Sequence, residues 1–251
     1  MAIKMKEAKR RKLRHVQVYD RLFAAIRKGE YPIGSKLPSE PELAKQMDVS
    51  RMTLRQALSL LQEDGIIKNY RGIGNFVKAK DSRFQNGLEE LSQPLFSCLE
   101  EEIDEVECEV RLENASDHME YVLYRNVDQV AVVDLWYKKN KKAIAYSLIF
   151  TPLENLQKYH ISIDQIDEIR QFCLYEIYKI VHRAKRYVKI SHSGNFTAHK
   201  YAISKNIMFY LIEESLFDQA DIPVMFMKHY CPIENGVLQI NAVNEKLTFG
   251  R

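Results

Sequence analysis

The stretch that most constrains the fold is LPSEPELAKQMDVSRMTLRQAL, at residues 37–58. Ser39 and Glu42 have the S-x-x-E spacing of a capping box, which predicts that a short helix begins there. The turn DVS follows, and Ser50 is a suitable N-cap for a longer helix that runs to about Asp64. Two short helices joined by a tight turn predict a helix-turn-helix arrangement.

The second helix carries cations at its N-terminal end, where the helix dipole disfavours positive charge. Its apolar residues recur at helical spacing and are expected to face inward: Leu54, Ala57, Leu58 and Leu61. The outward face then presents Arg51, Met52, Arg55 and Gln56, with Thr53 at its edge. DNA would explain this face, because phosphates and base edges supply the negative partner. The alternative is a solvated face whose arginines pair with Glu40 or Glu42.

The flanking segments complete the unit. Residues 16–28 have apolar residues at helical spacing and predict a first helix, which Gly29 ends. After the second helix of the motif, two β-prone runs surround RGIG, where Gly72 and Gly74 permit a tight hairpin with Arg71 at its tip. This hairpin is typical of a wing. A Walker or dinucleotide motif is excluded, because no Lys-Ser/Thr pair follows and strands flank both sides.

The charge is divided unevenly along the chain. Residues 1–80 hold 18 Lys and Arg against 8 Asp and Glu, whereas the other 171 residues hold 19 against 26. Residues 1–14 form a basic arm that contacts phosphates or is a solvated tail. This distribution predicts a nucleic-acid-binding unit joined to a larger unit with a different partner.

Residues 15–78 resemble the winged helix-turn-helix of the GntR family of bacterial transcription regulators, because the helix caps, both arginines and the glycine wing occur in order. The resemblance implies that Arg51 and Arg55 contact phosphate or guanine, that Thr53 contacts the backbone or a base, and that the wing reaches the minor groove. The predicted DNA-binding residues are Ser39, Arg51, Met52, Thr53, Arg55, Gln56, Arg71 and Gly72. The family often has Arg where this chain has Pro41, and a basic residue where it has Ile73.

The pattern of residues in the remainder of the chain predicts a linker at residues 79–95. It also predicts an α+β domain with an antiparallel sheet at residues 96–251. Strands are expected at 105–112, on both sides of a turn at 138–142, at 185–191, and in a hairpin at 208–230 that turns near 218–223. Helices are expected at 116–124, 171–180 and 197–204.

This order resembles the UTRA effector domain of HutC-type GntR regulators, whose fold is like that of chorismate lyase. The resemblance rests on CLYEI at residues 173–177 and on the last hairpin. Its implied effector-binding residues are Tyr137, Ser147, Cys173, Tyr175, Lys228 and Tyr230. The family's R-x-R is replaced by DLWY, and Met225 and Met227 stand where it has Glu and Ser, so a phosphosugar fits poorly.

Together these features predict a cytoplasmic bacterial transcription regulator, expected to be a repressor. Its expected partners are an inverted-repeat DNA operator, a second copy of the chain and a small-molecule effector. The four cysteines are far apart with no CxxC pair, so no metal site is predicted, and no cofactor is expected. Two alternatives stay open. In the first, the second domain only dimerises and binds no effector. In the second, the chain is a lyase-like enzyme, although no paired acid and base at catalytic spacing supports this alternative.

Overall fold

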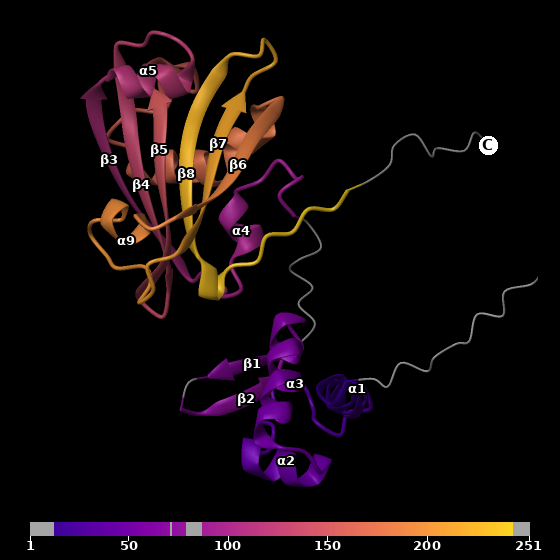
Figure 1. Cartoon of the computed structure of the whole chain (residues 1–251). Coiled ribbons are helices and arrows are strands. Elements are labelled where there is room, and N and C mark those ends of the chain that lie inside the picture. The colour runs from indigo at the N-terminus through magenta and orange to yellow at the C-terminus, as the bar shows by residue number, and fades with distance from the viewer. Residues whose placement is uncertain (1–12, 71, 79–86, 243–251) are drawn as a thin grey trace, which may run out of the picture. The chain divides into compact units, whose positions relative to one another are not determined.

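A computed structural model describes residues 13–70, 72–78 and 87–242 of the 251-residue chain. The chain divides into two compact units, Met1–Ser82 and Arg83–Arg251, which we describe separately (Figure 1). Most of the predicted basic arm, residues 1–12, lies outside the described residues. Residues 79–86 of the predicted linker also lie outside them, and residues 87–95 belong to the second unit. No helix in the described part of the chain is both long and apolar enough to cross a membrane.

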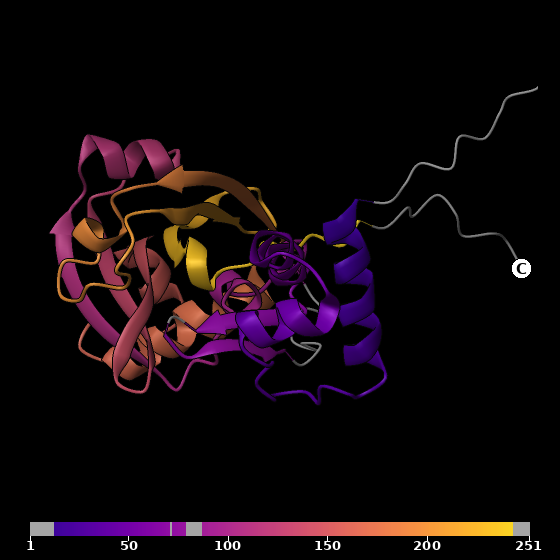
Figure 2. The same ribbon diagram turned by 60° about the horizontal axis from the view of Figure 1, so that its bottom comes forward.

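Within its described residues, the N-terminal unit has three helices and a two-stranded hairpin. The helices are α1 (Arg14–Arg27), α2 (Glu40–Met47) and α3 (Arg51–Glu63), and the strands are β1 (Ile67–Tyr70) and β2 (Gly74–Val77). The three helices run in different directions, with α1 upright, α2 across the view and α3 seen end-on in Figure 2. The apolar faces meet in one core, formed by Val18, Leu22, Leu37, Leu43, Ala44, Leu54, Ala57, Leu58, Leu61, Ile67 and Val77. The predicted winged helix-turn-helix is therefore confirmed.

Helix ends in this unit are held by the residues that the sequence indicated. The Ser39 backbone N–H donates to Glu42 Oε2 at 2.9 Å, and the Ser39 hydroxyl donates to the same oxygen at 2.7 Å. Ser50 Oγ accepts from the Thr53 backbone N–H at 3.1 Å, which caps α3. Asp48, at the end of α2, has a φ of 53° and makes the tight turn between the two helices.

The C-terminal unit is built on a six-stranded antiparallel sheet. Its strands are β3 (Glu105–Asn114), β4 (Gln129–Lys139), β5 (Lys142–Pro152), β6 (Arg183–Ser191), β7 (Phe209–Phe217) and β8 (Pro223–Pro232). Their spatial order is β3-β4-β5-β8-β7-β6, so β3 and β6 form the two edges. The predicted α+β class with an antiparallel sheet is confirmed.

Helices cover both faces of this sheet. The first face packs against α4 (Pro94–Cys98), α6 (Leu153–Lys158), α7 (Ile166–Gln171), the π-helical turn η2 (Phe172–Glu176) and α8 (Ile177–Ile180). The second face packs against α5 (Asp117–Leu123), which lies over one end of the strands, and against residues 198–203 after α9 (Gly194–Thr197) (Figure 1). A short 3-10 turn, η3 (Ile233–Asn235), follows β8.

The helix predicted at residues 197–204 is wrong. α9 ends at Thr197, residues 198–200 form a turn, and the chain to residue 203 is irregular, because two side chains occupy backbone groups of this segment. Asn195 accepts from the N–H groups of Ile203 and Ser204 at 2.8 and 3.1 Å, and the Trp136 indole donates to the Ala198 carbonyl at 2.8 Å. These long-range bonds replace the bonds of a regular helix.

Candidate nucleic-acid interface and ligand cavities

The first turns of α3 present an outward face as the sequence predicted. Arg51, Met52, Arg55 and Gln56 are exposed and Thr53 is half-buried, whereas Leu54, Ala57, Leu58 and Leu61 are buried. Met52 keeps 67% of its surface exposed, although it is a large apolar side chain. Such a side chain gains nothing from water and is suited to an external apolar contact, such as a thymine methyl group.

Arg55 has a partner within the protein. Its Nε donates to Glu40 Oε2 at 2.7 Å. For Arg55, the structure therefore has the ion pair that the sequence analysis gave as the alternative to DNA contact. The Arg55 side chain is 65% exposed and the Glu40 side chain 31%, so this pair adds about 0–1 kcal/mol to stability. The pair is therefore weak enough for a phosphate or a guanine to take over Arg55.

The wing lies beside the N-terminal ends of α2 and α3. A concavity of about 410 Å³ is lined by residues 36–41, Arg55, residues 69–70 and residues 72–75. It brings together three of the predicted contact residues, Ser39, Arg55 and Gly72. Arg71 lies outside the described residues, and its predicted contact stays a prediction.

Asn75 holds the wing against α3. This residue is 6% exposed, and its side-chain oxygen accepts from Gln62 Nε2 at 3.0 Å and from Asn69 Nδ2 at 2.9 Å. Gly72 and Gly74 have φ values of 78° and 128°, which other residues rarely adopt. The sequence pointed to these glycines but not to Asn75, whose role depends on the contact with α3.

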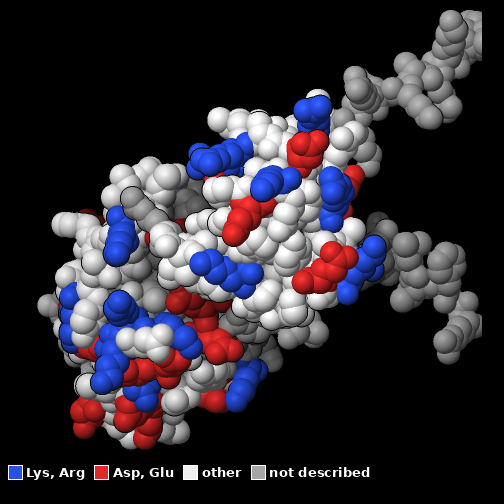
Figure 3. All heavy atoms as spheres, turned by 90° about the horizontal axis from the view of Figure 1, so that it is seen from below, with Lys and Arg blue, Asp and Glu red and all other residues white. Residues whose placement is uncertain are grey.

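The face of the molecule seen in Figure 3 carries both signs of charge, and its lysine and arginine side chains commonly have acidic neighbours. The predicted interface therefore depends on a few arginines at one helix end and not on a uniformly basic face, and its selectivity is expected to come from the outward side chains of α3.

Helix caps, an exposed α3 and a glycine wing define the class of the N-terminal unit, which is a winged helix-turn-helix. Residues 14–77 match the family model described as bacterial regulatory proteins, gntR family. The chain therefore carries a GntR-family domain at its N-terminus.

Proteins with repressor names are similar to this part of the chain. The HTH-type transcriptional repressor NagR of Bacillus subtilis (strain 168) is 38% identical over 84 residues, which are 33% of this chain and 35% of NagR. The probable fructoselysine utilization operon transcriptional repressor of Escherichia coli (strain K12) is 38% identical over 76 residues, 30% of each chain. The chain thus spans about a third of the length of these curated relatives.

Two solved structures are similar over most of the chain. The possible transcriptional regulator YydK from Bacillus subtilis has a TM-score of 0.48 and 16% identity, covering 92% of this chain and 100% of YydK. PhnF from Mycobacterium smegmatis has a TM-score of 0.47 and 18% identity, covering 93% and 99%.

The six predicted effector residues do not form one site. Tyr137, Ser147 and Cys173 are fully buried on the first face, where Ser147 Oγ donates to the Tyr137 hydroxyl at 3.2 Å. Burial raises the pKa of the Cys173 thiol, which is therefore protonated at neutral pH. These three side chains fill the interior of the unit and line no cavity that we describe.

Tyr230 and Lys228 lie on the second face, apart from Tyr137, Ser147 and Cys173, and their role in effector binding stays a prediction. Tyr230 is 4% exposed and its ring is 6.1 Å from that of Tyr146. A strand residue changes face at every position, so Lys228 and Tyr230 point away from Met227 and His229. The sequence resemblance identified the strand, but the pairing of the sheet decided which face each residue occupies.

A buried polar network on the first face was missed by the sequence analysis. Arg186 and Glu214 are cross-strand partners in β6 and β7, and their side chains pair at 2.6 Å with 9% and 0% exposure. Glu214 also accepts from the Tyr178 hydroxyl at 2.7 Å and lies 3.3 Å from His229 Nε2. Burial raises the pKa of Glu214, but the His229 hydrogen bond and the Arg186 charge outweigh burial, so its pKa lies below the usual range.

Arg186 also holds the segment that precedes α4. Its guanidinium donates to the backbone carbonyls of Leu88, Glu90 and Ser92 at 2.6, 2.7 and 2.8 Å. Four acceptors thus surround one side chain, and residues 88–92, which lie within the predicted linker, are fixed to the core of the sheet.

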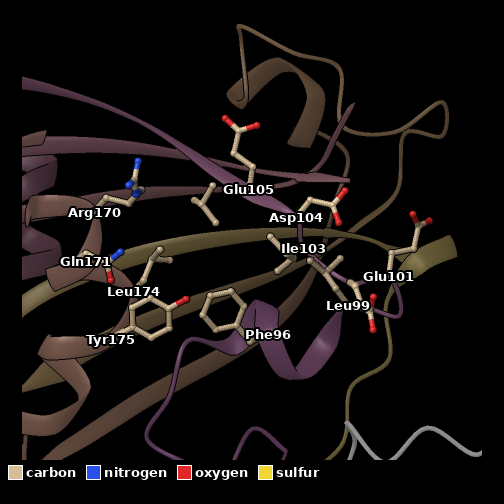
Figure 4. A pocket seen from close by; sticks show the side chains of 12 residues that line it. Phe96, Leu99, Glu101, Ile103, Asp104, Glu105, Arg170, Gln171, Leu174 and Tyr175 are labelled. Carbon is tan, nitrogen blue, oxygen red and sulfur yellow. The ribbon is translucent and has the colours of Figure 1, made fainter. Parts of the chain in front are cut away.

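Tyr175 lines a cavity of about 580 Å³ between α4, the start of β3 and η2 (Figure 4). The rings of Phe96 and Tyr175 are stacked with centroids 5.6 Å apart, and carboxylates of residues 101–105 lie on the β3 side. Asp104 accepts from the Asn140 backbone N–H and from Lys139, which lowers its pKa. Of the six predicted effector residues, Tyr175 is the one that lines this cavity.

Proposed function

We propose that this protein is a homodimeric transcriptional regulator, acting as a repressor in the bacterial cytoplasm, that binds an inverted-repeat DNA operator. The observation that carries the proposal is the exposed N-terminal face of α3 beside a glycine wing, within a domain of the GntR family. The repressor names of the similar proteins support the direction of regulation.

In this proposal α3 enters the major groove. Thr53 and Gln56 read base edges, Met52 contacts a thymine methyl group, and Arg51 and Arg55 bind phosphate or guanine. Glu40 orients Arg55 before DNA is bound, because the two side chains already form an ion pair. Ser39 and the wing residues Arg71 and Gly72 contact the backbone, and the basic arm adds phosphate contacts.

A dimer follows from the size of one recognition helix, which contacts only a few base pairs, so two-fold symmetry doubles the sequence that is read. The edge strand β6 supports a dimer surface in the C-terminal unit. Tyr187, Val188 and Ile190 on this strand are exposed by 50%, 43% and 52%. A long edge strand with exposed apolar residues pairs readily with a second copy. Sedimentation should give a dimer at micromolar concentration, and Val188→Lys should weaken it.

The C-terminal unit is proposed to be a UTRA-type effector domain of the HutC subfamily. Its candidate effector cavity is the one beside Tyr175, and an effector there contacts Phe96 on α4. The segment before α4 is held by Arg186, so in this proposal a shift of α4 that breaks those bonds releases the chain that leads to the DNA-binding unit. The alternative, a domain that only dimerises, is favoured by the buried positions of Tyr137, Ser147 and Cys173, where the resemblance placed a ligand.

The DNA proposal is tested by separating base reading from phosphate binding. An operator is first selected in vitro from random duplexes. Gln56→Ala should cost about 1–3 kcal/mol on this operator and little on a scrambled duplex. Arg55→Ala should weaken both duplexes if its contact is to phosphate, whereas a loss on the operator alone would make Arg55 the guanine reader. Gln157→Ala, an exposed glutamine in α6, is the matched control and should change neither affinity.

The effector proposal is tested by thermal unfolding with a panel of metabolites. A ligand of the Tyr175 cavity should raise the Tm of the wild type, alter operator affinity, and have no effect on the Tyr175→Ala variant. If ligands that bind leave operator affinity unchanged, or if the panel contains none that binds, the domain that only dimerises becomes the better description.

A further inference from the structure

A second cavity lies at the other face of the C-terminal unit. It encloses about 740 Å³ and is lined by Tyr124, Arg125, Arg183, Lys185, Phe217, Asp221, Ile222 and Pro223. The end of α5 and the turn between β7 and β8 lie at the same end of the sheet (Figure 1). Arg183, Phe217 and Pro223 form a row of cross-strand partners through β6, β7 and β8, which makes the floor.

The charged side chains in this lining are three cations and one carboxylate. Arg183 pairs with Asp221 at 2.5 Å, and its guanidinium lies 3.7 Å from the centre of the Phe217 ring. Lys185 is on the same face two residues along the strand and is exposed to the cavity. The lining therefore has a surplus of positive charge.

Arg125 adds an unsatisfied donor. One of its Nη groups pairs with Glu154, which is not part of the lining, but its buried Nε has no hydrogen-bond partner within the described part of the chain. A buried donor without a partner destabilises the side chain in this position. An oxyanion in the cavity would supply an acceptor for this donor if the Arg125 side chain reoriented toward it.

Tyr124 stands at the rim in a costly conformation. It ends α5 with a φ of 54°, a position where glycine is usual and a bulky side chain is uncommon. Its side chain is 58% exposed, and its ring lies 6.4 Å from that of Phe217. The Tyr124 ring and the Ile222 side chain add apolar surface, an apolar wall, to a lining that also holds the cations.

We propose that this cavity binds a small organic oxyanion, a carboxylate or a phosphate ester with an apolar group, whose charge is held by Arg125, Arg183 and Lys185 and whose apolar part packs against Tyr124 and Ile222. Arginine supplies paired donors for either oxyanion, and the apolar wall favours an anion that carries an apolar group over an inorganic ion. This binding is a property of the C-terminal unit and does not depend on the proposed DNA binding.

Calorimetric titration of the full chain without DNA tests the proposal. The probes are benzoate, phenyl phosphate, inorganic phosphate and the neutral analogue benzamide. We expect benzoate or phenyl phosphate to bind at least about tenfold more tightly than benzamide, because a hydrogen bond to a charged group is stronger than one to a neutral group. Inorganic phosphate should bind more weakly than phenyl phosphate. The tighter of the two aromatic anions identifies the oxyanion that the cavity prefers.

Three variants locate the binding. Lys185→Gln and Arg183→Gln should each weaken the preferred anion about tenfold or more. Tyr124→Gly should weaken it severalfold while leaving Tm unchanged or raised, because glycine relieves the left-handed conformation. Lys205→Gln, an exposed lysine outside the cavity, should have no effect. The Tm of each variant shows that a loss of binding is not a loss of folding.

Several results would overturn the proposal. These are equal affinity for benzoate, phenyl phosphate and benzamide, the absence of binding at millimolar probe, or wild-type affinity in both Lys185→Gln and Arg183→Gln. Loss of binding in Tyr175→Ala would place the probe in the cavity beside Tyr175, and this result would also exclude the cavity beside Tyr124 as the binding site.

Discussion

Both units have short-range helix caps, but the C-terminal unit also depends on polar bonds between residues that are much farther apart in the sequence. In the N-terminal unit, the Ser39 backbone N–H donates to the Glu42 carboxylate, and the Ser50 hydroxyl accepts from the Thr53 N–H. The partners in each bond are three residues apart. In the C-terminal unit, Arg186 reaches carbonyls 94 to 98 residues away, and Ser147 contacts His229 across 82 residues. Local bonds define helix ends, whereas long-range bonds define how a sheet is assembled. The first kind of bond is readable in a sequence, and the second is not.

The largest expected effect comes from breaking the long-range network. Glu214→Ala leaves Arg186 and His229 buried without their carboxylate, which should lower the free energy of unfolding of the C-terminal unit by about 3–5 kcal/mol. Urea unfolding followed by Trp136 fluorescence measures it, since the chain has 1 tryptophan and it is buried in this unit.

Glu213→Ala is the matched control for this substitution. Glu213 is the neighbouring residue on the opposite face and pairs with Lys189, whose side chain is 54% exposed. The control should cost less than about 1 kcal/mol. Equal losses in the two variants would show that the buried network does not matter more than a surface pair.

The core of the N-terminal unit should respond separately. Leu61→Ala removes a side chain with 0% exposure and should destabilise this unit by about 2–5 kcal/mol. Amide hydrogen exchange of α1 to α3 should accelerate, while the Trp136 unfolding midpoint stays unchanged. Ile33→Ala, at a side chain that is 69% exposed, should leave exchange unaffected. A shift of the Trp136 midpoint in Leu61→Ala would contradict the independence of the two units.

Acid should affect the C-terminal unit through its paired carboxylates. Burial raises the pKa of Glu107, but hydrogen bonds from Lys138, Lys200 and Tyr201 lower it to about 2, and the pKa of Glu214 is also lowered. A carboxylate whose pKa is lowered in the folded state stabilises the fold at pH values above its unfolded pKa of about 4.5. This contribution to stability is lost as the pH falls toward the folded-state pKa. We expect the free energy of unfolding of the C-terminal unit, followed by Trp136 fluorescence, to fall between pH 5 and pH 2. The contribution of Glu107 to this fall should be about 1–2 kcal/mol. Glu107→Gln should reduce this drop, and an unchanged pH profile would exclude the assignment.

The smallest expected effect is on a local cap. Ser50→Ala removes the hydroxyl that accepts from the Thr53 N–H, and should destabilise α3 by about 1 kcal/mol. Hydrogen exchange at the start of α3 measures the change. Ser59→Ala, at an exposed position on the same helix, should change exchange there by less. A larger effect from Ser59→Ala would show that the cap does not hold this helix end.

The contrast between the units explains which expectations were correct. The capping box, the Ser50 cap and the paired glycines predicted α2, α3 and the wing with bounds close to those observed, because each signal acts within a few residues. The helix expected at 116–124 is likewise confirmed as α5, and the Ser116 hydroxyl before it accepts from the Met119 N–H at 3.3 Å. The helix expected at 197–204 failed because Asn195 and Trp136 take its backbone groups, and one of these partners lies on β4.

The candidate sites divide in the same way. The outward residues of α3 could be predicted from helical spacing, and so could the glycines of the wing. The effector residues could not be grouped, because a strand places neighbours on opposite faces and only the assembled sheet decides which elements pack on each face. The Arg183–Phe217–Pro223 row that forms the second cavity joins positions with no shared pattern in the sequence.

By itself, the sequence determined that a winged helix-turn-helix stands at the N-terminus, that the remainder is α+β with an antiparallel sheet, and that Arg51, Arg55 and Gln56 face outward. Tertiary structure alone decided that Glu40 holds Arg55, that Arg186 and Glu214 meet in the core, and that two cavities of opposite charge lie at different faces of the sheet. The physical reason is range: caps and helical periodicity depend on neighbours three or four residues apart, whereas strand order and buried pairing depend on contacts between distant segments that form only when the sheet is assembled.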